Sequence, residues 1–463
     1  MIRINSNLTP ARLLPKINRL WTVSATKIES IEKSNPPHAA APVYTSDGCY
    51  TTRGWTDWTR GFQHGSSLLQ FDATDDSAFL KLGRRRTIED MPGHLTHVGV
   101  HDHGFNIIST YGNLWRLGRE GRLPDTEPSE SYLELALKVS GAVQAARWAA
   151  VRGGGGYIYS FNGPQSLFID TMRSCRVLAV AHLLGHTLSG EQDQSISLLG
   201  RLIDHATTTA RHNVYYGKGR DAYDMRGRVA HESLFNTNNG DYRCPSTQQG
   251  FSPFSTWTRG LAWAMCGYAE LLEFMHAHGN TMPQHGLDID AVTQTLREAA
   301  IATCDFYIDQ TPACGIPYWD TGASRLYELG DYLNRAADPF NASEPVDSSA
   351  AAIASQGLLR LARCLHTEGD TNAASRYFHA GLTVLDTLFD EPYLSIDPQH
   401  QGLILHAIYH RPNGWDRIPV GRSVPCGESS MWGDYHAREV ALYVQRLAHG
   451  QPYLVFYGPE DTS

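Results

Sequence analysis

Hydrophobic side chains recur three and four positions apart along several segments of the chain, a spacing that places them on one face of an α-helix. These segments are 129–152, 167–188, 194–210, 260–278, 289–310, 348–367, 372–389 and 435–448. Asp347-Ser348-Ser349 precedes one of them as a cluster of helix-capping residues. Alternating, strand-like runs are short and lie in the connections, at 157–161 and 403–410. The pattern predicts a mainly helical chain.

No Pro/Ser-rich linker divides the 463 residues. We therefore expect one all-α domain over residues 1–463, built as a toroid of stacked helix pairs, with residues 1–45 as an N-terminal extension. The longest irregular stretch is 213–256, which is rich in glycine, asparagine, aspartate and aromatic residues. A loop of this length in a compact domain is usually functional or disordered, and its aromatic content favours a functional role.

The composition excludes several classes of protein. Hydrophobic residues make up 41% of the chain and charged residues 19%, as in a folded protein with a large core. A net charge of -9 argues against a broad nucleic-acid surface, which would be basic. No apolar run is long enough for a transmembrane helix or a secretory signal. The eight cysteines are irregularly spaced, as expected of free thiols in a reducing compartment. We predict a cytoplasmic protein without membrane or nucleic-acid partners.

The first candidate for chemistry is Asp102, in the run His101-Asp102-His103-Gly104-Phe105. The carboxylate is expected just before a helix, where the helix dipole favours negative charge. A simple helix-capping role is the alternative. The flanking histidines could suggest a metal site, but adjacent residues of an extended strand point apart. We therefore predict neither a metal nor another cofactor.

The second candidate is Asp170, which interrupts the apolar run Leu167-Phe168-Ile169. A buried carboxylate is costly unless it is paired or protonated. Burial and a neighbouring carboxylate would both raise its pKa, which would make a general acid available near neutral pH. A structural ion pair with Arg173 or Arg176 is the alternative.

The third candidate is the segment from Gln249 to Trp263, which contains Trp257 and Arg259. Arg259 and Trp263 are four residues apart, so they share one helix face. A guanidinium offers a planar fork for a carboxylate, and tryptophan rings offer stacking surfaces for sugars. Helix capping and core packing are the alternative explanation.

Taken together, these motifs resemble the unsaturated glucuronyl hydrolases. The resemblance covers about residues 50 to 450. Further matching motifs are Trp55-Thr56-Asp57-Trp58-Thr59-Arg60-Gly61-Phe62, Ile316-Pro317-Tyr318-Trp319-Asp320 and Trp432-Gly433-Asp434-Tyr435. The family fold is an (α/α)6 barrel, which agrees with the predicted helix pairs. The family removes a 4,5-unsaturated uronic acid from the non-reducing end of oligosaccharides that polysaccharide lyases have produced.

The resemblance also implies roles for individual residues. Asp170 matches the main general acid/base, and Asp102 matches the second essential aspartate. The positions that match substrate-binding residues are Trp58, His101, Phe161, His231, Gln249, Trp257, Arg259, Trp263 and Tyr409. Phe161 stands where the family has a tryptophan, and Gln248 precedes Gln249 where the family commonly has a histidine.

The reaction that the resemblance implies needs no metal. A proton is added to C4 of the C4=C5 bond, and an oxocarbenium-like centre forms at C5. Water then adds at C5, and the resulting hemiketal opens and releases the second sugar. The expected partner is the unsaturated oligosaccharide. Formation of a homodimer is possible, and the sequence does not decide it.

Three other functions compete with this interpretation. An unsaturated rhamnogalacturonyl hydrolase would use the same barrel and chemistry on pectin fragments. A polysaccharide lyase or an ordinary glycosidase could also use this barrel, and His101, His231 or Tyr409 could act as the base of a lyase. A non-catalytic sugar-binding protein would keep the tryptophans but would not need Asp102 and Asp170.

Overall fold

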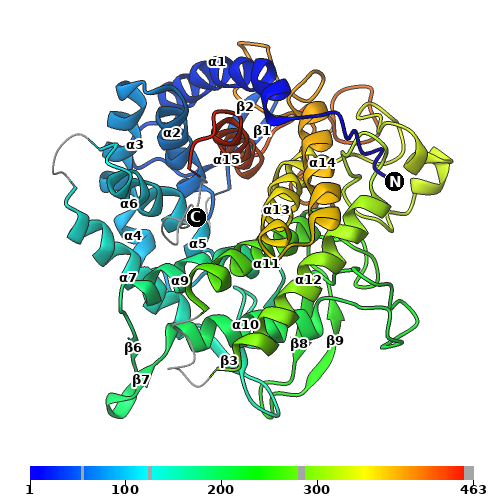
Figure 1. Ribbon diagram of the computed structural model, residues 1–463. Helices are drawn as coiled ribbons and strands as arrows, with labels where there is room; N and C mark the ends of the chain where they lie inside the picture. Colours follow the sequence, from blue (N-terminus) through cyan, green and yellow to red (C-terminus); the bar gives the residue numbers. More distant parts are fainter. Residues whose placement is uncertain (54–56, 124–127, 280–286, 453–463) are drawn as a thin grey trace.

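The computed structural model describes residues 1–53, 57–123, 128–279 and 287–452. Its helices follow one another around a ring in chain order and alternate between an outer and an inner layer (Figure 1). The outer helices are α1 (Pro10–Ser34), α3 (Ser77–Asp90), α7 (Glu130–Ala146), α10 (Leu198–His212), α12 (Ile289–Gln310) and α14 (Thr371–Leu388). The inner helices are α2 (Arg60–Thr74), α5 (His103–Ile107) with α6 (Asn113–Arg119), α8 (Thr171–Ser174) with α9 (Arg176–Leu183), α11 (Thr258–His278), α13 (Ser348–Thr367) and α15 (Met431–Ala448). The fold is an (α/α)6 barrel.

Burial separates the two layers. Almost every residue of α11 and α13 is buried, as expected of helices covered on all sides. Outer helix α10 buries a stripe that includes Leu198, Leu202 and Ala206, whereas Arg201, Asp204 and Thr207 on its opposite face are only partly buried. The inner helices close a ring through the contacts α2–α5, α5–α8, α8–α11, α11–α13, α13–α15 and α15–α2. This ring places the N-terminal ends of α5, α8 and α11 near one another.

The connections between the helices contain short strands. β5 (Ser166–Phe168), β8 (Glu232–Phe235) and β9 (Tyr242–Ser246) form an antiparallel sheet in the order β5-β8-β9. β3 (Trp148–Ala150) pairs with β4 (Gly156–Ile158), β1 (Pro42–Ser46) pairs with β2 (Cys49–Thr52), and β6 (Leu188–Ser189) pairs with β7 (Ser195–Ile196). The predicted loop 213–256 therefore contains two strands.

Two predicted helices differ from the observed ones. The segment 129–152 is helical only to Ala146, after which β3 begins. The segment 167–188 begins as strand β5, turns at Asp170 and contains only the short helices α8 and α9. Short apolar runs such as Leu167-Phe168-Ile169 suit a buried strand as well as a helix, so periodicity could not separate the two.

The hydrophobic pattern missed the helices of the first 120 residues. Helix α1 lies within the sequence expected as an N-terminal extension, and it packs in the outer layer against α15, α2 and α14. Helix α2 is buried on all sides although it carries Gln63, His64 and Gln70, which hide its periodicity. Within the described residues, no helix combines the length and the apolar character needed to cross a membrane.

Candidate active site

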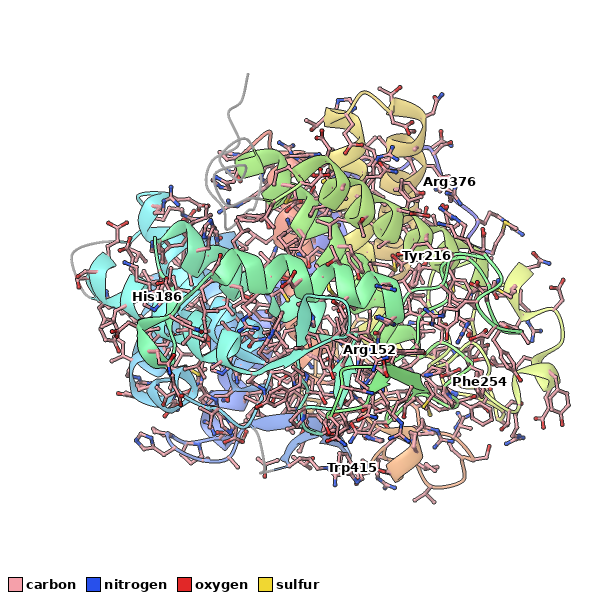
Figure 2. The ribbon with its side chains drawn as sticks, turned by 90° about the horizontal axis from the view of Figure 1, so that it is seen from below. Arg152, His186, Tyr216, Phe254, Arg376 and Trp415 are labelled. Atoms are coloured by element: carbon pink, nitrogen blue, oxygen red, sulfur yellow. The ribbon has the colours of Figure 1, made fainter. Side chains whose placement is uncertain are left out.

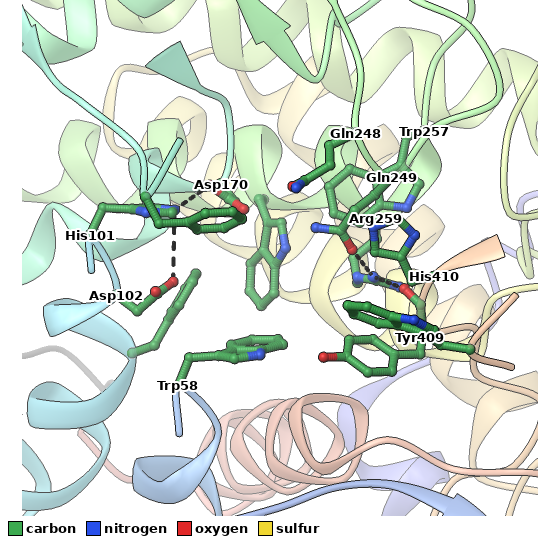
Figure 3. A pocket seen from close by; sticks show the side chains of 14 residues that line it. Trp58, His101, Asp102, Asp170, Gln248, Gln249, Trp257, Arg259, Tyr409 and His410 are labelled. Atoms are coloured by element: carbon green, nitrogen blue, oxygen red, sulfur yellow. Dashed lines mark hydrogen bonds and ion pairs between the residues drawn. The ribbon is translucent and has the colours of Figure 1, made fainter. Parts of the chain in front are cut away.

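A pocket opens at the end of the barrel where α5, α8 and α11 begin (Figure 3). The lining residues are Trp58, His101, Asp102, Phe105, Phe161, Asp170, Gln248, Gln249, Trp257, Arg259, Trp263, Tyr409, His410 and Trp415. The structure thus brings ten of the eleven predicted site residues into one cavity, and the remaining one, His231, lies behind its wall.

Asp102 is the residue that precedes α5, but its side chain caps no backbone N–H of that helix. The carboxylate is buried, with 6% of the residue exposed, and it faces the pocket. Asp102 therefore lies directly before a helix, as predicted, but its side chain does not act as a helix cap. A buried carboxylate without a capping role is available for chemistry.

Asp170 stands in the turn between β5 and α8. The structural ion pair considered for it is not formed. Arg173 instead contacts Glu439 at 2.5 Å and Glu270 at 3.2 Å, and Arg176 pairs with the same two glutamates. These arginines belong to a buried charge network inside the barrel, so the carboxylate of Asp170 faces the pocket instead.

His101 connects the two aspartates. Its Nε2 lies 3.2 Å from Oδ1 of Asp170 and 3.8 Å from Oδ1 of Asp102. Two donors fix the His101 backbone, because Ser174 Oγ and Gln144 Nε2 both donate to its carbonyl oxygen, at 2.7 and 2.9 Å. The ring of Phe161 stacks on the imidazole at 5.7 Å between centroids. His101 is thus held in one orientation.

The two carboxyl groups differ in proton affinity. Burial raises the pKa of Asp102 to about 6, because the charge on His101 offsets only part of the lost hydration. Burial also opposes ionisation of Asp170, but its hydrogen bond to His101 and the charges of His101, His231 and Arg259 bring its pKa below the ordinary value. The expectation of a raised pKa at Asp170 is therefore wrong for the substrate-free site. The raised value belongs to Asp102, which lies farther from the imidazole nitrogen.

His103 points away from the pocket. Its Nδ1 lies 2.7 Å from Ser140 Oγ, and its Nε2 lies 3.1 Å from the carbonyl oxygen of His97. His101 and His103 therefore do not converge on one point, although His103 begins α5 and the residues do not form the extended strand that the sequence argument assumed.

Arg259 does not present an open fork to the pocket. Its Nη1 donates to Asp347 at 3.0 Å and to the carbonyl oxygen of Ile408, and its Nη2 donates to Gln249 Oε1 and the carbonyl oxygen of Tyr409, both at 2.8 Å. Four N–H groups are thus already bonded within the protein. Arg259 orients Gln249 and contributes positive charge, and the predicted bidentate hold on a substrate carboxylate would require these bonds to break.

Aromatic rings form much of the pocket wall. Trp58 stacks on Trp432 at 5.0 Å between centroids, and Phe105 packs against Trp263 at 4.8 Å. His231 supports Trp257 from behind at 4.8 Å. Its Nδ1 accepts the backbone N–H of Gln248 at 3.0 Å, which positions the Gln248-Gln249 turn. The predicted aromatic residues therefore form surfaces on which a sugar ring can stack.

Sequence reasoning missed four lining residues, namely Phe105, Gln248, His410 and Trp415. The first three lie within or beside segments that were singled out, so neighbouring positions could have indicated them. Trp415 lies in the connection between the predicted segments 403–410 and 435–448, where no periodic pattern marked it. Asp347 was identified as a helix cap, and it both caps α13 and pairs with Arg259.

No protein-family model matches the chain. The chain is 27% identical over 422 residues to the unsaturated glucuronyl hydrolase of Bacillus sp. (strain GL1), covering 89% of this chain and 92% of that protein. It is 26% identical over 394 residues to the unsaturated glucuronyl hydrolase of Formosa agariphila, covering 84% and 80%. The crystal structure of the Bacillus sp. GL1 enzyme superposes with a TM-score of 0.69 over 94% of this chain and 96% of that chain, at 23% identity.

The chain is therefore similar to unsaturated glucuronyl hydrolases over most of its length. A crystal structure of an unsaturated glucuronyl hydrolase specific for heparin also shares the fold, with a TM-score of 0.70 at 19% identity over 94% of this chain and 98% of that chain. The protein is a glycoside hydrolase similar to the unsaturated glucuronyl hydrolases.

Proposed function

We propose that this hydrolase removes a 4,5-unsaturated uronic acid from the non-reducing end of lyase-generated oligosaccharides. The observation that carries the proposal is a pair of buried carboxyl groups, Asp102 and Asp170, which share one histidine in an aromatic pocket. The relatives named unsaturated glucuronyl hydrolase support this reaction. A relative from Streptococcus pyogenes named unsaturated chondroitin disaccharide hydrolase, 23% identical over 86% of this chain and 84% of that protein, supports it as well.

Below about pH 6 the pair holds one proton, on Asp102, while Asp170 is ionised. An anionic sugar that enters the pocket adds a like charge and excludes water, and both effects raise the pKa of a carboxyl group. The proton held by Asp102 then passes to Asp170, which donates it to C4 of the substrate and leaves both side chains as carboxylates. The positive charge that develops at C5 and the ring oxygen is stabilised by the nearby carboxylates, and Asp170 as a carboxylate accepts a proton from the water that adds at C5.

The walls hold the sugar ring while this happens. Trp58, Phe161, Trp257 and Trp263 offer apolar faces, and Gln248 and Gln249 offer amide groups for hydroxyl or carboxylate oxygens. His231 places its Nδ1 as an acceptor, and its buried Nε2 has no hydrogen-bond partner among the described residues. The hydroxyl of Tyr409 points into the cavity toward Trp58 (Figure 3).

Loss of the ultraviolet absorbance of the conjugated C4=C5 uronate tests the proposal. The enzyme is mixed with lyase-generated disaccharides from glycosaminoglycans and with unsaturated rhamnogalacturonan disaccharides. Rapid loss on a glucuronyl substrate supports the proposal and names the sugar class. Loss on the pectin-derived substrates alone would favour a rhamnogalacturonyl hydrolase, and a rise of absorbance on an intact polysaccharide would favour a lyase.

We also propose that the enzyme acts as a single catalytic domain in the cytoplasm. The eight cysteines are all free thiols, and five of them are buried, which suits a reducing compartment. Retention of the enzyme with a cytoplasmic marker on cell fractionation would support this location, and recovery in the external medium would contradict it.

A further inference from the structure

An aromatic patch lies on the surface of the 213–256 segment, outside the pocket. Tyr223, Phe251 and Phe254 are 51%, 48% and 43% exposed. The rings of Tyr223 and Phe254 stack on each other, with centroids 4.4 Å apart and planes 22° apart. Large apolar side chains that gather on a surface typically mark an interaction site.

Buried polar contacts hold this patch in place. Arg228 is 4% exposed, and it donates from Nε to the carbonyl oxygen of Tyr223 at 2.7 Å and from Nη1 to that of Pro253 at 3.3 Å. One arginine thus fastens the two backbone segments that carry the stacked rings. The carboxylate of Asp224 also accepts backbone N–H groups of Gly217, Lys218 and Arg220. A surface that is already ordered loses little entropy when it binds a ligand.

The patch continues from the wall of the pocket. Gln249 lines the pocket, and Phe251 is two residues farther along, within ~8 Å between Cα atoms. The backbone N–H of Phe251 donates to Asp320 Oδ2 at 2.8 Å, and Asp320 forms a β-bridge with Trp257 of the pocket wall. In Figure 2, Phe254 lies toward the right of the molecule and the pocket residue Trp415 lies at its lower edge. An oligosaccharide that leaves the pocket past Gln249 would pass Phe251 first, and Arg228 holds the Tyr223–Phe254 stack next to the same segment.

We propose that Tyr223, Phe251 and Phe254 form a platform for substrate sugars that lie beyond the residue next to the cleaved bond. The inference rests on the proposed function, because only an oligosaccharide whose unsaturated end occupies the pocket would extend across it. Aromatic faces suit the apolar faces of sugar rings. The platform would make the enzyme prefer longer fragments over disaccharides.

Comparison of a disaccharide and a tetrasaccharide that a lyase releases from one polymer tests this. We expect wild-type kcat/KM to be higher for the tetrasaccharide. The double variant Tyr223→Ala/Phe254→Ala should lose about tenfold on the tetrasaccharide, which corresponds to ~1.4 kcal/mol, and nothing on the disaccharide. Leu135→Ala, which removes an exposed apolar side chain from α7, is the control and should change neither rate.

Equal kcat/KM of the double variant and the wild type on the tetrasaccharide would overturn the platform, as would equal losses on both substrates. Sedimentation velocity tests whether a second copy of the chain covers the patch instead. If the wild type is a dimer and the double variant is a monomer, the patch is a subunit interface and the platform is overturned. If the wild type turns over neither substrate, the proposed function fails instead. In that case, calorimetry still tests the platform: weaker binding of the tetrasaccharide to the double variant than to the wild type would support it, and equal binding would overturn it.

Discussion

The imidazole nitrogen of His101 lies 3.2 Å from the carboxylate of Asp170, close enough to donate a hydrogen bond. Asp102 is 3.8 Å from the same nitrogen, beyond hydrogen-bond range. A hydrogen bond to the charged form stabilises that form, so this difference contributes to the lower pKa of Asp170. Below about pH 6, Asp170 is therefore ionised while Asp102 carries a proton.

Asp170→Asn should abolish most turnover and leave the fold intact. The variant keeps the volume of the side chain but cannot exchange a proton with the substrate or water, and we expect a loss of about 10²–10⁴-fold in kcat. Steady-state loss of uronate absorbance measures it, and circular dichroism checks the fold. Asp75→Asn alters an aspartate with an 85% exposed side chain at the end of α2 and should keep full activity. Normal turnover by Asp170→Asn would remove the residue from the mechanism.

The pH dependence of kcat/KM should be bell-shaped, because the reaction needs the aspartate pair with one proton. The rate should fall as the pH rises through about 6, where Asp102 loses its proton, and fall again below the lowered pKa of Asp170. His101→Gln removes a positive charge and a charge-assisted hydrogen bond, so both limbs should move to higher pH. If the two apparent pKa values of the kcat/KM profile do not change in this variant, His101 does not set the pKa values of the aspartates.

Asp102→Asn should make the protein more stable above pH 6 while it loses activity. The pKa of Asp102 rises from 3.8 to about 6 on folding, so the native state binds more protons than the unfolded state between these values, and stability falls as the pH rises through them. The loss amounts to up to ~3 kcal/mol. Urea unfolding of both proteins, well above and well below this pH window, measures it. A stability difference that does not change with pH would contradict the assignment.

Gly104→Ala should disturb the site through the backbone. A Cβ at Gly104 would lie 2.0 Å from the carbonyl oxygen of Ser174, so α5 and α8 could not approach as they do. We expect a destabilisation of ~1–3 kcal/mol or more and a large drop in kcat, because these helices carry Asp102 and Asp170. At Gly93 a Cβ would meet no atom within 4 Å, so Gly93→Ala is the matched control. Comparable thermal unfolding of the two variants would show that the close approach is not required.

The sequence indicated the helical barrel and nearly all of the pocket, but not the electrostatics. The long helices α11 to α15 were predicted well because their apolar residues recur three and four positions apart over long segments. Helices α5 and α8, which carry the two aspartates, are too short for a periodic signal. The bonds of Arg259 join it to Asp347, Ile408 and Tyr409, which are 88 to 150 residues away, and no local pattern shows such partners. The order of the two carboxyl pKa values depends on distances of a few tenths of an ångström.

The floor and the rim of the pocket come from different parts of the fold. Asp102 and Asp170 stand at the starts of inner helices, which the packed barrel holds in place. Gln248 and Trp415 belong to connections between helices. Substitutions, insertions or deletions in these connections can therefore change which oligosaccharides fit while the aspartate pair stays where it is. Because the rim and the aspartate pair come from different parts of the fold, related barrels can evolve different substrate ranges and keep the same reaction.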